Sequence, residues 1–363
     1  MVLQSALIRI FLKLFSKGES VNWNLLKKLS DEIGLPGDEG RIRNILRHEI
    51  APFTESIKVD AMGNLIAHIG GKGPKLMLDA HMDEVGFMVN HIEDGGFLRV
   101  IPLGGVDPRV FYAQQVIVWA QKPLVGVVGA IPIHLTRDNP SAQDKPIPIE
   151  DCFIDLGISA QKVKKTVKLG DLVTFDRKCI ETEESFIGKA FDDRIGVFIM
   201  IEAVKSASRI GCDLYIVGAV QEEGGMRGAG PAAFEVKPQL GLSLEGTVAN
   251  DVPGAPPSKR LAIQGNGPEI RLSDSRFVAD REWSFFISEL AKRRKIKHQI
   301  IVKKVGGTNA SAVQTTGVGA KTTALSVPLR YIHSPQGIVR KDDIEGAIEL
   351  ATSVIEEAKN FKF

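Results

Sequence analysis

Residues 75–83 read KLMLDAHMD, and this segment predicts the class of the fold. Residues 75–80 form a short, largely apolar run after a Gly-Pro pair, a pattern typical of a strand that is buried on both faces. Buried strands of this kind are found in α/β proteins. We therefore expect a mixed α/β fold in which His81 and Asp83 follow a central strand, where open α/β sheets bind ligands.

The flanking segments agree with an α/β fold. Within residues 22–49, apolar residues keep helical spacing on both sides of a GLPG break, which predicts two helices. Alternating residues around a turn at 62–64 predict a hairpin. The elements expected after residue 188 are a helix over 194–206, a strand over 213–220 and a closing helix over 342–359.

The middle of the chain has a different pattern. Between residues 85 and 176, short β-like runs such as 115–119 alternate with Gly and Pro, and no segment has a convincing helical period. This pattern predicts a small all-β domain inserted into the α/β domain. The expected boundaries are residues 22–85 and 177–363 for the α/β domain, 86–176 for the inserted domain and 1–21 for a helical N-terminal extension.

Composition and charge exclude several classes of protein. The 363 residues carry 46 Lys and Arg against 44 Asp and Glu, a formal net charge of +2, so no global field attracts nucleic acid or an acidic membrane. No apolar run reaches the roughly 18 residues that a membrane span needs. The three cysteines are odd in number and widely spaced, which indicates a reducing compartment, and we expect a cytoplasmic protein.

A histidine and an acid follow the central strand at a spacing suited to metal binding. In extended backbone, residues two apart point the same way, so His81 and Asp83 can place a metal-binding imidazole beside a carboxylate that orients it. Ordinary polar loop residues also produce His-x-Asp triplets. This motif alone leaves both interpretations open.

Two glutamates follow the strand predicted at 213–220. Glu222 and Glu223 precede a Gly-Gly pair, and in this pattern one side chain can hold a metal while its neighbour faces the opposite way and moves protons. A pair of solvated loop acids is the alternative.

Three further segments add candidate ligands. Asp192 and Asp193 stand at the start of the predicted helix, where the helix dipole alone also favours acids. Glu245 ends a strand-like run, and His333 follows the apolar stretch 323–327. Together these segments supply two imidazoles and several carboxylates, which is the set that two adjacent divalent ions require.

In this order, the segments resemble those of the M42 family of metallo-aminopeptidases, which includes the tetrahedral TET aminopeptidases. The resemblance covers about residues 23–358. Its motifs are HMDEVG at 81–86, AFDDRIG at 190–196, QEE at 221–223, GGT at 306–308 and RYIHSP at 330–335. The resemblance implies an α/β/α sandwich catalytic domain of the phosphorylase/hydrolase-like, zinc-peptidase type, with the inserted β-barrel-like domain mediating dimer contacts.

The resemblance also implies roles for individual residues. The implied metal ligands are Asp192, which bridges two ions, His81 and Glu245 at one ion, and Glu223 and His333 at the other. Glu222 would be the general base, and Asp83 would orient His81. The two divalent ions would be zinc or cobalt, with manganese as a third option.

Two positions depart from the family pattern. Glu245 stands where many relatives have aspartate, and its longer side chain would change the position of the metal or the substrate preference. Asn309 stands where relatives often have aspartate after Gly-Gly-Thr, which removes a charge near the site.

The implied activity is the removal of N-terminal residues from short peptides. A metal-bridged water would attack the scissile carbonyl, and Glu222 would take the proton of that water and pass it to the leaving amine. Dimers would assemble into a tetrahedral particle of twelve subunits. We expect no nucleic-acid partner and no membrane partner.

Two other functions stay open at this point. Some proteins that resemble this one are labelled endoglucanases, and glycosidases also use paired carboxylates. A glycosidase site, however, needs no histidine. A non-catalytic assembly protein with a vestigial site is the other alternative, although every implied ligand position holds a competent side chain.

Overall fold

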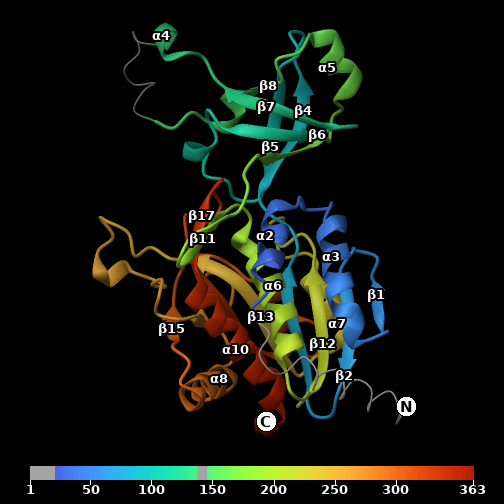
Figure 1. Ribbon diagram of the computed structural model, residues 1–363, viewed down its shortest axis with the longest axis vertical. Helices are drawn as coiled ribbons and strands as arrows, with labels where there is room; N and C mark the ends of the chain where they lie inside the picture. The colour runs from blue at the N-terminus through green and yellow to red at the C-terminus, as the bar shows by residue number, and fades with distance from the viewer. Residues whose placement is uncertain (1–20, 137–144) are drawn as a thin grey trace.

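The strand predicted at residues 75–80 lies in the middle of a large sheet (Figure 1). The computed structural model describes residues 21–136 and 145–363. Strand β3 (Lys75–His81) pairs in parallel with β12 (Asp213–Ala219) on one side and with β13 (Leu240–Val248) on the other. His81 is the last residue of β3, so the strand is one residue longer than predicted.

In the described part of the chain, eleven strands form this sheet. The order along it is β1 (Ile57–Val59), β2 (Leu65–Gly70), β12, β3, β13, β16 (Lys321–Arg330), β17 (Gly337–Arg340), β11 (Ser185–Gly188) and β10 (Ile180–Glu181). Strand β14 (Glu269–Ser273) pairs with β16 and with β15 (Gln299–Val302). Strands β1 and β2 are antiparallel around residues 62–64, which confirms the predicted hairpin.

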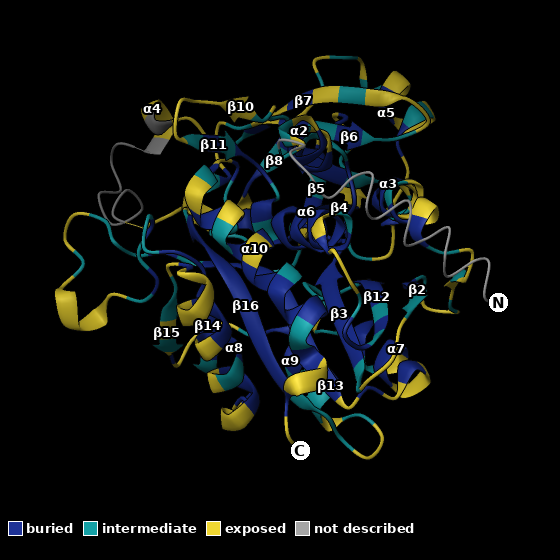
Figure 2. Cartoon of the chain, turned by 60° about the horizontal axis from the view of Figure 1, so that its bottom comes forward, coloured by how far each residue is buried: buried dark blue, intermediate teal, exposed yellow. Residues whose placement is uncertain are grey.

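Helices cover both faces of the sheet and produce the predicted three-layer sandwich (Figure 1). Alternate side chains of β3 point to opposite faces, since Leu76 and Leu78 join one core cluster and Met77 joins the other. The helices on the Leu76 face are α2 (Trp23–Asp31), α3 (Gly40–Ile50), α6 (Phe191–Ser206), α8 (Arg281–Arg294) and α10 (Lys341–Glu357), and those on the Met77 face are α7 (Ala229–Val236) and α9 (Asn309–Thr315). Figure 2 shows β3 and β16 buried along most of their length between these layers.

Helix α6 lies directly against the central strands β3 and β13. Asp192 and Asp193 have non-helical backbone angles, so the regular helix begins after them at Arg194, as predicted. This geometry holds the two acids at the end of the helix rather than along its side. The strand predicted at 213–220 is β12, and the predicted closing helix is α10.

The segment between β3 and β10 forms a closed barrel next to the sheet (Figure 1). The strand order is β4 (Gly86–Ile92), β5 (Leu98–Leu103), β8 (Phe153–Asp155), β7 (Pro123–Gly129), β6 (Gln115–Trp119) and β9 (Leu172–Phe175). The barrel has its own core, separate from that of the sheet, in which Phe87 packs against Phe111 and Phe175.

The prediction that this segment contains no helix was wrong. Helix α5 (Ala160–Thr166) is capped by Ser159, whose Oγ accepts a hydrogen bond from the Lys162 N–H, and Val163 is its one buried residue. A short helix that buries a single side chain leaves no apolar period in the sequence, which explains the error. A further short helix, α4, covers Ile133–Thr136.

Short 3-10 helices complete the described structure. They are η1 (Ala51–Phe53), η2 (Pro108–Val110), η4 (Ile149–Asp151), η5 (Pro257–Lys259) and η6 (Ala358–Asn360). The helical extension predicted over residues 1–21 falls almost entirely outside the described residues, which begin at residue 21. Within the described residues, no helix has the length and apolar character needed to cross a membrane.

Gly196 allows α6 to approach β13 closely. A Cβ at this position would collide with the Leu244 carbonyl and with both carboxylate oxygens of Asp193. Gly196→Ala should therefore lower the free energy of unfolding, measured by urea denaturation, by about 1–3 kcal/mol. The control is Gly230→Ala in α7, where a Cβ would lie 3.6 Å from Thr316 Oγ1 and should raise that free energy by up to about 1 kcal/mol or leave it unchanged. Equal losses in the two variants would contradict this packing account.

Candidate metal centre

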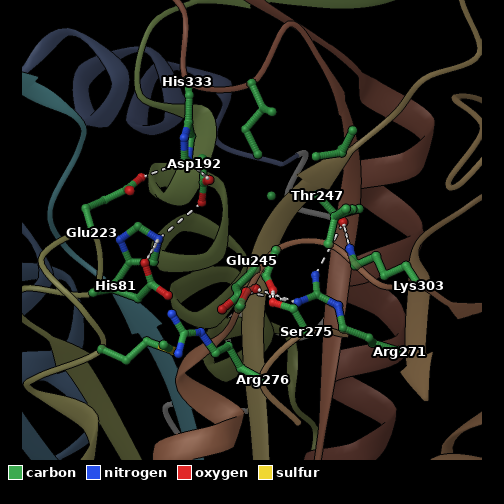
Figure 3. Close-up of a pocket in the computed structure, with 18 of the residues that line it drawn as sticks. His81, Asp192, Glu223, Glu245, Thr247, Arg271, Ser275, Arg276, Lys303 and His333 are labelled. Carbon is green, nitrogen blue, oxygen red and sulfur yellow. Dashed lines mark hydrogen bonds and ion pairs between the residues drawn. The ribbon is translucent and has the colours of Figure 1, made fainter. Parts of the chain in front are cut away.

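The predicted site residues come together at one edge of the sheet, in a pocket of about 430 Å³ (Figure 3). They are His81 at the end of β3, Asp192 at the start of α6, Glu222 and Glu223 after β12, Glu245 in β13 and His333 between β16 and β17. Strands β3, β12 and β13 are parallel, so their carboxyl ends meet at this edge. The topology of the sheet therefore explains how residues far apart in the chain share one pocket.

Asp192 lies between the two histidines. Its Oδ1 is 3.1 Å from Nε2 of His81, and its Oδ2 is 3.2 Å from Nε2 of His333. Each oxygen of one carboxylate therefore faces a different imidazole. A carboxylate placed in this way is suited to bridge two cations.

Backbone carbonyl groups orient both histidines. Nδ1 of His81 lies 3.0 Å from the carbonyl oxygen of Asp83, and Nδ1 of His333 lies 2.9 Å from that of Gly105. A carbonyl oxygen only accepts, so Nδ1 is the donor in each ring. Nε2 of each ring faces Asp192 and donates to it in the protein without metal, and a metal ion would take the place of that proton. Gly105 follows barrel strand β5, so the barrel segment helps to orient His333.

The two adjacent glutamates sit on a turn that Asp83 holds. Oδ1 of Asp83 accepts a hydrogen bond from the Glu222 N–H at 3.0 Å, and Oδ2 accepts one from the Glu223 N–H at 2.9 Å. The same carboxylate is 3.5 Å from Nδ1 of His81. The carboxylate of Asp83 thus makes its shortest contacts with the turn. Its backbone carbonyl, at 3.0 Å, is closer to His81 than its carboxylate is, and the sequence did not predict these separate roles.

Two sets of side chains bring their donor atoms within 4.8 Å of one another. One set is Asp192, Glu223 and His333, and the other is His81, Glu222 and Glu223. Within these sets, Glu223 Oε1 is 3.1 Å from His333 Nε2, and Glu222 Oε2 is 4.0 Å from His81 Nε2. The first set contains the residues that the sequence assigned to one ion.

Glu245 lines the same pocket but belongs to neither of these sets. Its Oε2 accepts a hydrogen bond from Nη1 of Arg271 at 3.3 Å, whereas its Oε1 is buried and has no hydrogen-bond partner among the described residues. A buried carboxylate oxygen that lacks a partner is costly unless a cation satisfies it. This oxygen, together with the two imidazole Nε2 atoms, fits the donor set of a divalent metal centre.

Burial raises the pKa values of the acids in the pocket. It raises the pKa of Glu245 to about 7 and holds the pKa of Glu222 well above its usual range, with neighbouring carboxylates adding to the effect. Asp192 differs, because hydrogen bonds from the two imidazoles outweigh its burial and lower its pKa. Buried acids that disfavour one another's ionisation gain from a divalent cation, which stabilises all of their charged forms together.

Asp193 supports the site in a way that the sequence interpretation missed. Its Oδ2 accepts a hydrogen bond from the His81 N–H at 3.2 Å, and its Oδ1 accepts from Gly196 at 2.9 Å and from Gly246 at 3.1 Å. One buried carboxylate thus ties β3, α6 and β13 together. Only the pairing of two acids before a buried helix hinted at it.

Arg271 is the second missed residue. It lies on β14, is buried, and pairs with Glu269 at 2.7 Å and Asp274 at 3.1 Å as well as with Glu245. Its one signal in the sequence is a charge within a short strand-like run, EIRLS at 269–273.

Asn309, one of the two departures from the family pattern, is buried and does not line the pocket. Asn309 begins α9 and lies near Asp79, a buried residue of β3 that accepts a hydrogen bond from Ser243 Oγ at 2.8 Å.

Comparison with known families identifies the chain. The family model of the M42 glutamyl aminopeptidases matches residues 63–350. The chain belongs to the M42 glutamyl aminopeptidase family. This M42 protein is therefore an enzyme of the metallo-aminopeptidase class, which confirms the resemblance seen in the sequence.

Relatives of this M42 protein align over nearly their whole length. The lysyl aminopeptidase of Pyrococcus furiosus is 34% identical over 351 residues, which cover 94% of this chain and 99% of that protein. The structure of aminopeptidase APDkam598 from Desulfurococcus kamchatkensis has a TM-score of 0.88 at 33% identity, over 94% of this chain and 97% of that one.

Two further structures bear on assembly and on activity. The Pyrococcus horikoshii TET1 peptidase, described as able to assemble into a tetrahedron or a large octahedral shell, has a TM-score of 0.82 at 32% identity over 92% of this chain and 99% of its own. A Thermotoga maritima structure described as an endoglucanase has a TM-score of 0.76 at 34% identity, over 92% and 97% of the two chains.

Asp83→Asn should loosen the turn at 221–223. The asparagine keeps one acceptor oxygen but turns its amide toward the second backbone N–H, which then loses its partner. We expect the affinity for Zn²⁺ to fall about 10–100-fold, measured by competition with a chromogenic chelator. The control is Asp343→Asn, because Asp343 also accepts one backbone hydrogen bond at each oxygen, from Gly265 and Gly267 at 2.7 Å, does not line the pocket, and should leave the affinity unchanged. An unchanged affinity in the Asp83 variant would refute its assigned role.

Proposed function

We propose that this M42 protein is a dinuclear metal-dependent aminopeptidase that releases N-terminal residues from short peptides. In this proposal, Asp192 would be a ligand shared by two divalent ions, His81 and Glu245 would complete one site, and Glu223 and His333 would complete the other. The observation that carries the proposal is the position of Asp192, whose two oxygens lie 3.1 and 3.2 Å from the Nε2 atoms of different histidines. Nitrogen and oxygen donors of this kind suit zinc, cobalt or manganese.

The proposed general base is Glu222. When bound, two divalent ions acidify a water molecule and stabilise the charge that develops on the scissile carbonyl oxygen. Glu223 lies 3.1 Å from an imidazole Nε2, whereas Glu222 lies 4.0 Å from His81 and is free to face the pocket. Burial raises the pKa of Glu222, so this carboxylate can accept a proton from the water and deliver it to the leaving amine.

The proposal gives Asp83 a positioning role. Its carboxylate fixes the backbone of both glutamates, and its carbonyl fixes the ring of His81. The base and one metal ligand are therefore held by a single residue. This arrangement keeps Glu222 at a constant place relative to His81 during proton transfer.

We further propose that the barrel forms dimer contacts and that dimers assemble into a twelve-subunit tetrahedral particle. Apolar side chains exposed on the barrel support this view, among them Val125 and Val127 on β7, which are 57% and 52% exposed. Exposed apolar surface of this kind is typical of contacts between subunits. The similarity to the TET1 peptidase supports the same assembly.

The proposed domain division places residues 22–85 and 177–363 in the catalytic domain and 86–176 in the inserted domain. The separate core of the barrel supports this division. We also propose a cytoplasmic location, supported by the free thiols of Cys152, Cys179 and Cys212.

A glycosidase is the second candidate, because a similar structure is described as an endoglucanase. Paired carboxylates are sufficient for glycoside hydrolysis, which needs neither a bridging carboxylate nor two oriented histidines. The two functions differ in their need for metal, so they can be separated by experiment.

Glu222→Gln and Glu223→Gln are a matched pair, since the residues are adjacent and each variant loses one negative charge. The Glu222 variant should keep its metal and lose about 10²–10⁴-fold in kcat, because it can no longer move the proton. The Glu223 variant should instead lose bound metal. Elemental analysis and the hydrolysis of aminoacyl p-nitroanilides measure the two effects.

Chelation is the control for this pair. A chelator should abolish wild-type hydrolysis, and added Zn²⁺ or Co²⁺ should restore it. Wild-type turnover by the metal-loaded Glu222 variant would refute the assignment of the base. Absence of metal after reconstitution would favour a non-catalytic assembly protein, and chelator-resistant release of sugar from a soluble glucan would favour the glycosidase.

A further inference from the structure

A second cavity adjoins the metal pocket, the pocket of about 430 Å³ that holds the proposed centre. The second cavity has a volume of about 760 Å³ and shares Val248 and Ile332 with the lining of the metal pocket. The rest of its lining comes from the barrel segment, from Arg177 and from the turn between β16 and β17. The second cavity therefore lies beside the proposed centre, where the barrel meets the large sheet (Figure 1).

The turn between β16 and β17 separates the two spaces. His333 lines the metal pocket, whereas Tyr331 and Ser334 line the second cavity. Tyr331 is 54% exposed, so its ring can contact a molecule that enters this cavity. A peptide that passes from the metal pocket into the second cavity would cross this turn next to His333.

The second cavity contains one unbalanced positive charge. The charged side chains in its described lining are Asp107, Arg109 and Arg177. Asp107 and Arg109 neutralise each other, because Nε of the arginine lies 3.0 Å from Oδ1 and 2.8 Å from Oδ2 of the aspartate. Arg177 forms no ion pair with any residue that the structure describes. Its charge is therefore available to a ligand.

The hydrogen bonds of Arg177 leave only donors free. Its Nη1 donates to the Asp176 carbonyl at 2.7 Å, and its Nη2 donates to Gln114 Oε1 at 2.6 Å. A guanidinium has no acceptor, so the Gln114 amide turns its oxygen to Arg177 and keeps its NH₂ group free. That NH₂ group and the remaining N–H groups of the guanidinium have no acceptor among the described residues. Adjacent donors of which one is charged suit a carboxylate.

We propose that Arg177 and Gln114 bind the C-terminal carboxylate of a short peptide substrate. The inference rests on the proposed function, in which the first residue of the peptide occupies the metal pocket. The residues after the scissile bond then need a path out of that pocket, and the second cavity supplies one past the turn at 331–334. A guanidinium binds a carboxylate through two parallel hydrogen bonds. The site therefore selects peptides that end within the second cavity, whatever their first residue is.

The test compares peptides that differ only at the C-terminus. Metal-loaded wild-type and variant proteins are assayed with Leu-Gly, Leu-Gly-Gly and Leu-Gly-Gly-Gly, each as the free acid and as the C-terminal amide. For at least one of these lengths, wild type should favour the acid roughly 5–50-fold in kcat/KM, because the amide replaces a charged hydrogen-bonded contact with a neutral one. Arg177→Gln should remove this preference, mainly through KM.

Further substrates and variants separate a binding role from a structural one. Leucine p-nitroanilide has no carboxylate beyond its scissile bond, so Arg177→Gln should leave its hydrolysis within about twofold. Arg177→Lys keeps the charge and should restore part of the preference for the acid. The matched control is Lys178→Gln, because this neighbouring residue does not line the second cavity and its substitution removes the same charge. The control should keep the wild-type preference.

An acidic side chain is the other source of a carboxylate in a peptide. Amidated Leu-Gly-Glu and amidated Leu-Gly-Gln differ in this group alone, and wild type should hydrolyse them at rates within about twofold of each other. Calorimetric titration with the released products and with their amides should show a higher affinity for the free acids without catalysis. A gain from the glutamate side chain that equals or exceeds the gain from the terminal carboxylate would overturn the inference.

The outcomes also separate this inference from the proposed function. Hydrolysis of the peptides with no preference for the free acid at any length would overturn the inference and leave the aminopeptidase assignment intact. An equal loss on leucine p-nitroanilide and on the peptides in the Arg177→Gln variant would overturn it as well, because the residue would then support the structure of the reacting centre. Failure of the metal-loaded wild type on every substrate would refute the proposed function itself.

Discussion

The confinement of several carboxylates in one buried pocket is the constraint on which the site depends. Burial raises the pKa values of Glu222, Glu223 and Glu245, so these groups cannot all ionise without compensating positive charge. Asp192 gains that compensation from two imidazoles, one at each oxygen. Glu245 gains it at one oxygen from Arg271, and its second oxygen has no hydrogen-bond partner within the part of the chain that the structure describes. The cluster of carboxylates therefore favours bound cations. Asp192, the carboxylate between the two histidines, contacts both imidazoles.

The fold supports this cluster with groups that do not line the pocket. The carboxylate of Asp193 ties three elements of the sandwich together, and that of Asp83 holds the turn of the two glutamates. The carbonyl of Gly105 orients His333 from the end of a barrel strand. The sheet, helix α6 and the barrel therefore all contribute to the position of the ligands. A small change in packing between these layers would alter the metal centre without removing any ligand.

The sequence predicted those parts of the structure that depend on local pattern. The apolar run before His81 indicated a central strand, and the parallel sheet then placed the strand-end acids together. The sequence could not predict contacts between distant segments, because no local hydrophobic period encodes such contacts. Arg271 and the Gly105 carbonyl approach the site from far along the chain, and α5 buries one residue and leaves no period. The sequence named Asp83, but it could not separate the role of its carboxylate from that of its carbonyl.

The claim that Asp192 bridges two divalent ions can be tested most directly by anomalous X-ray diffraction from crystals grown with Zn²⁺. The account predicts two anomalous peaks per chain on opposite sides of the Asp192 carboxylate, one nearest His81 and the other nearest His333. A single peak per chain in excess Zn²⁺, or two peaks of which neither contacts Asp192, would contradict it.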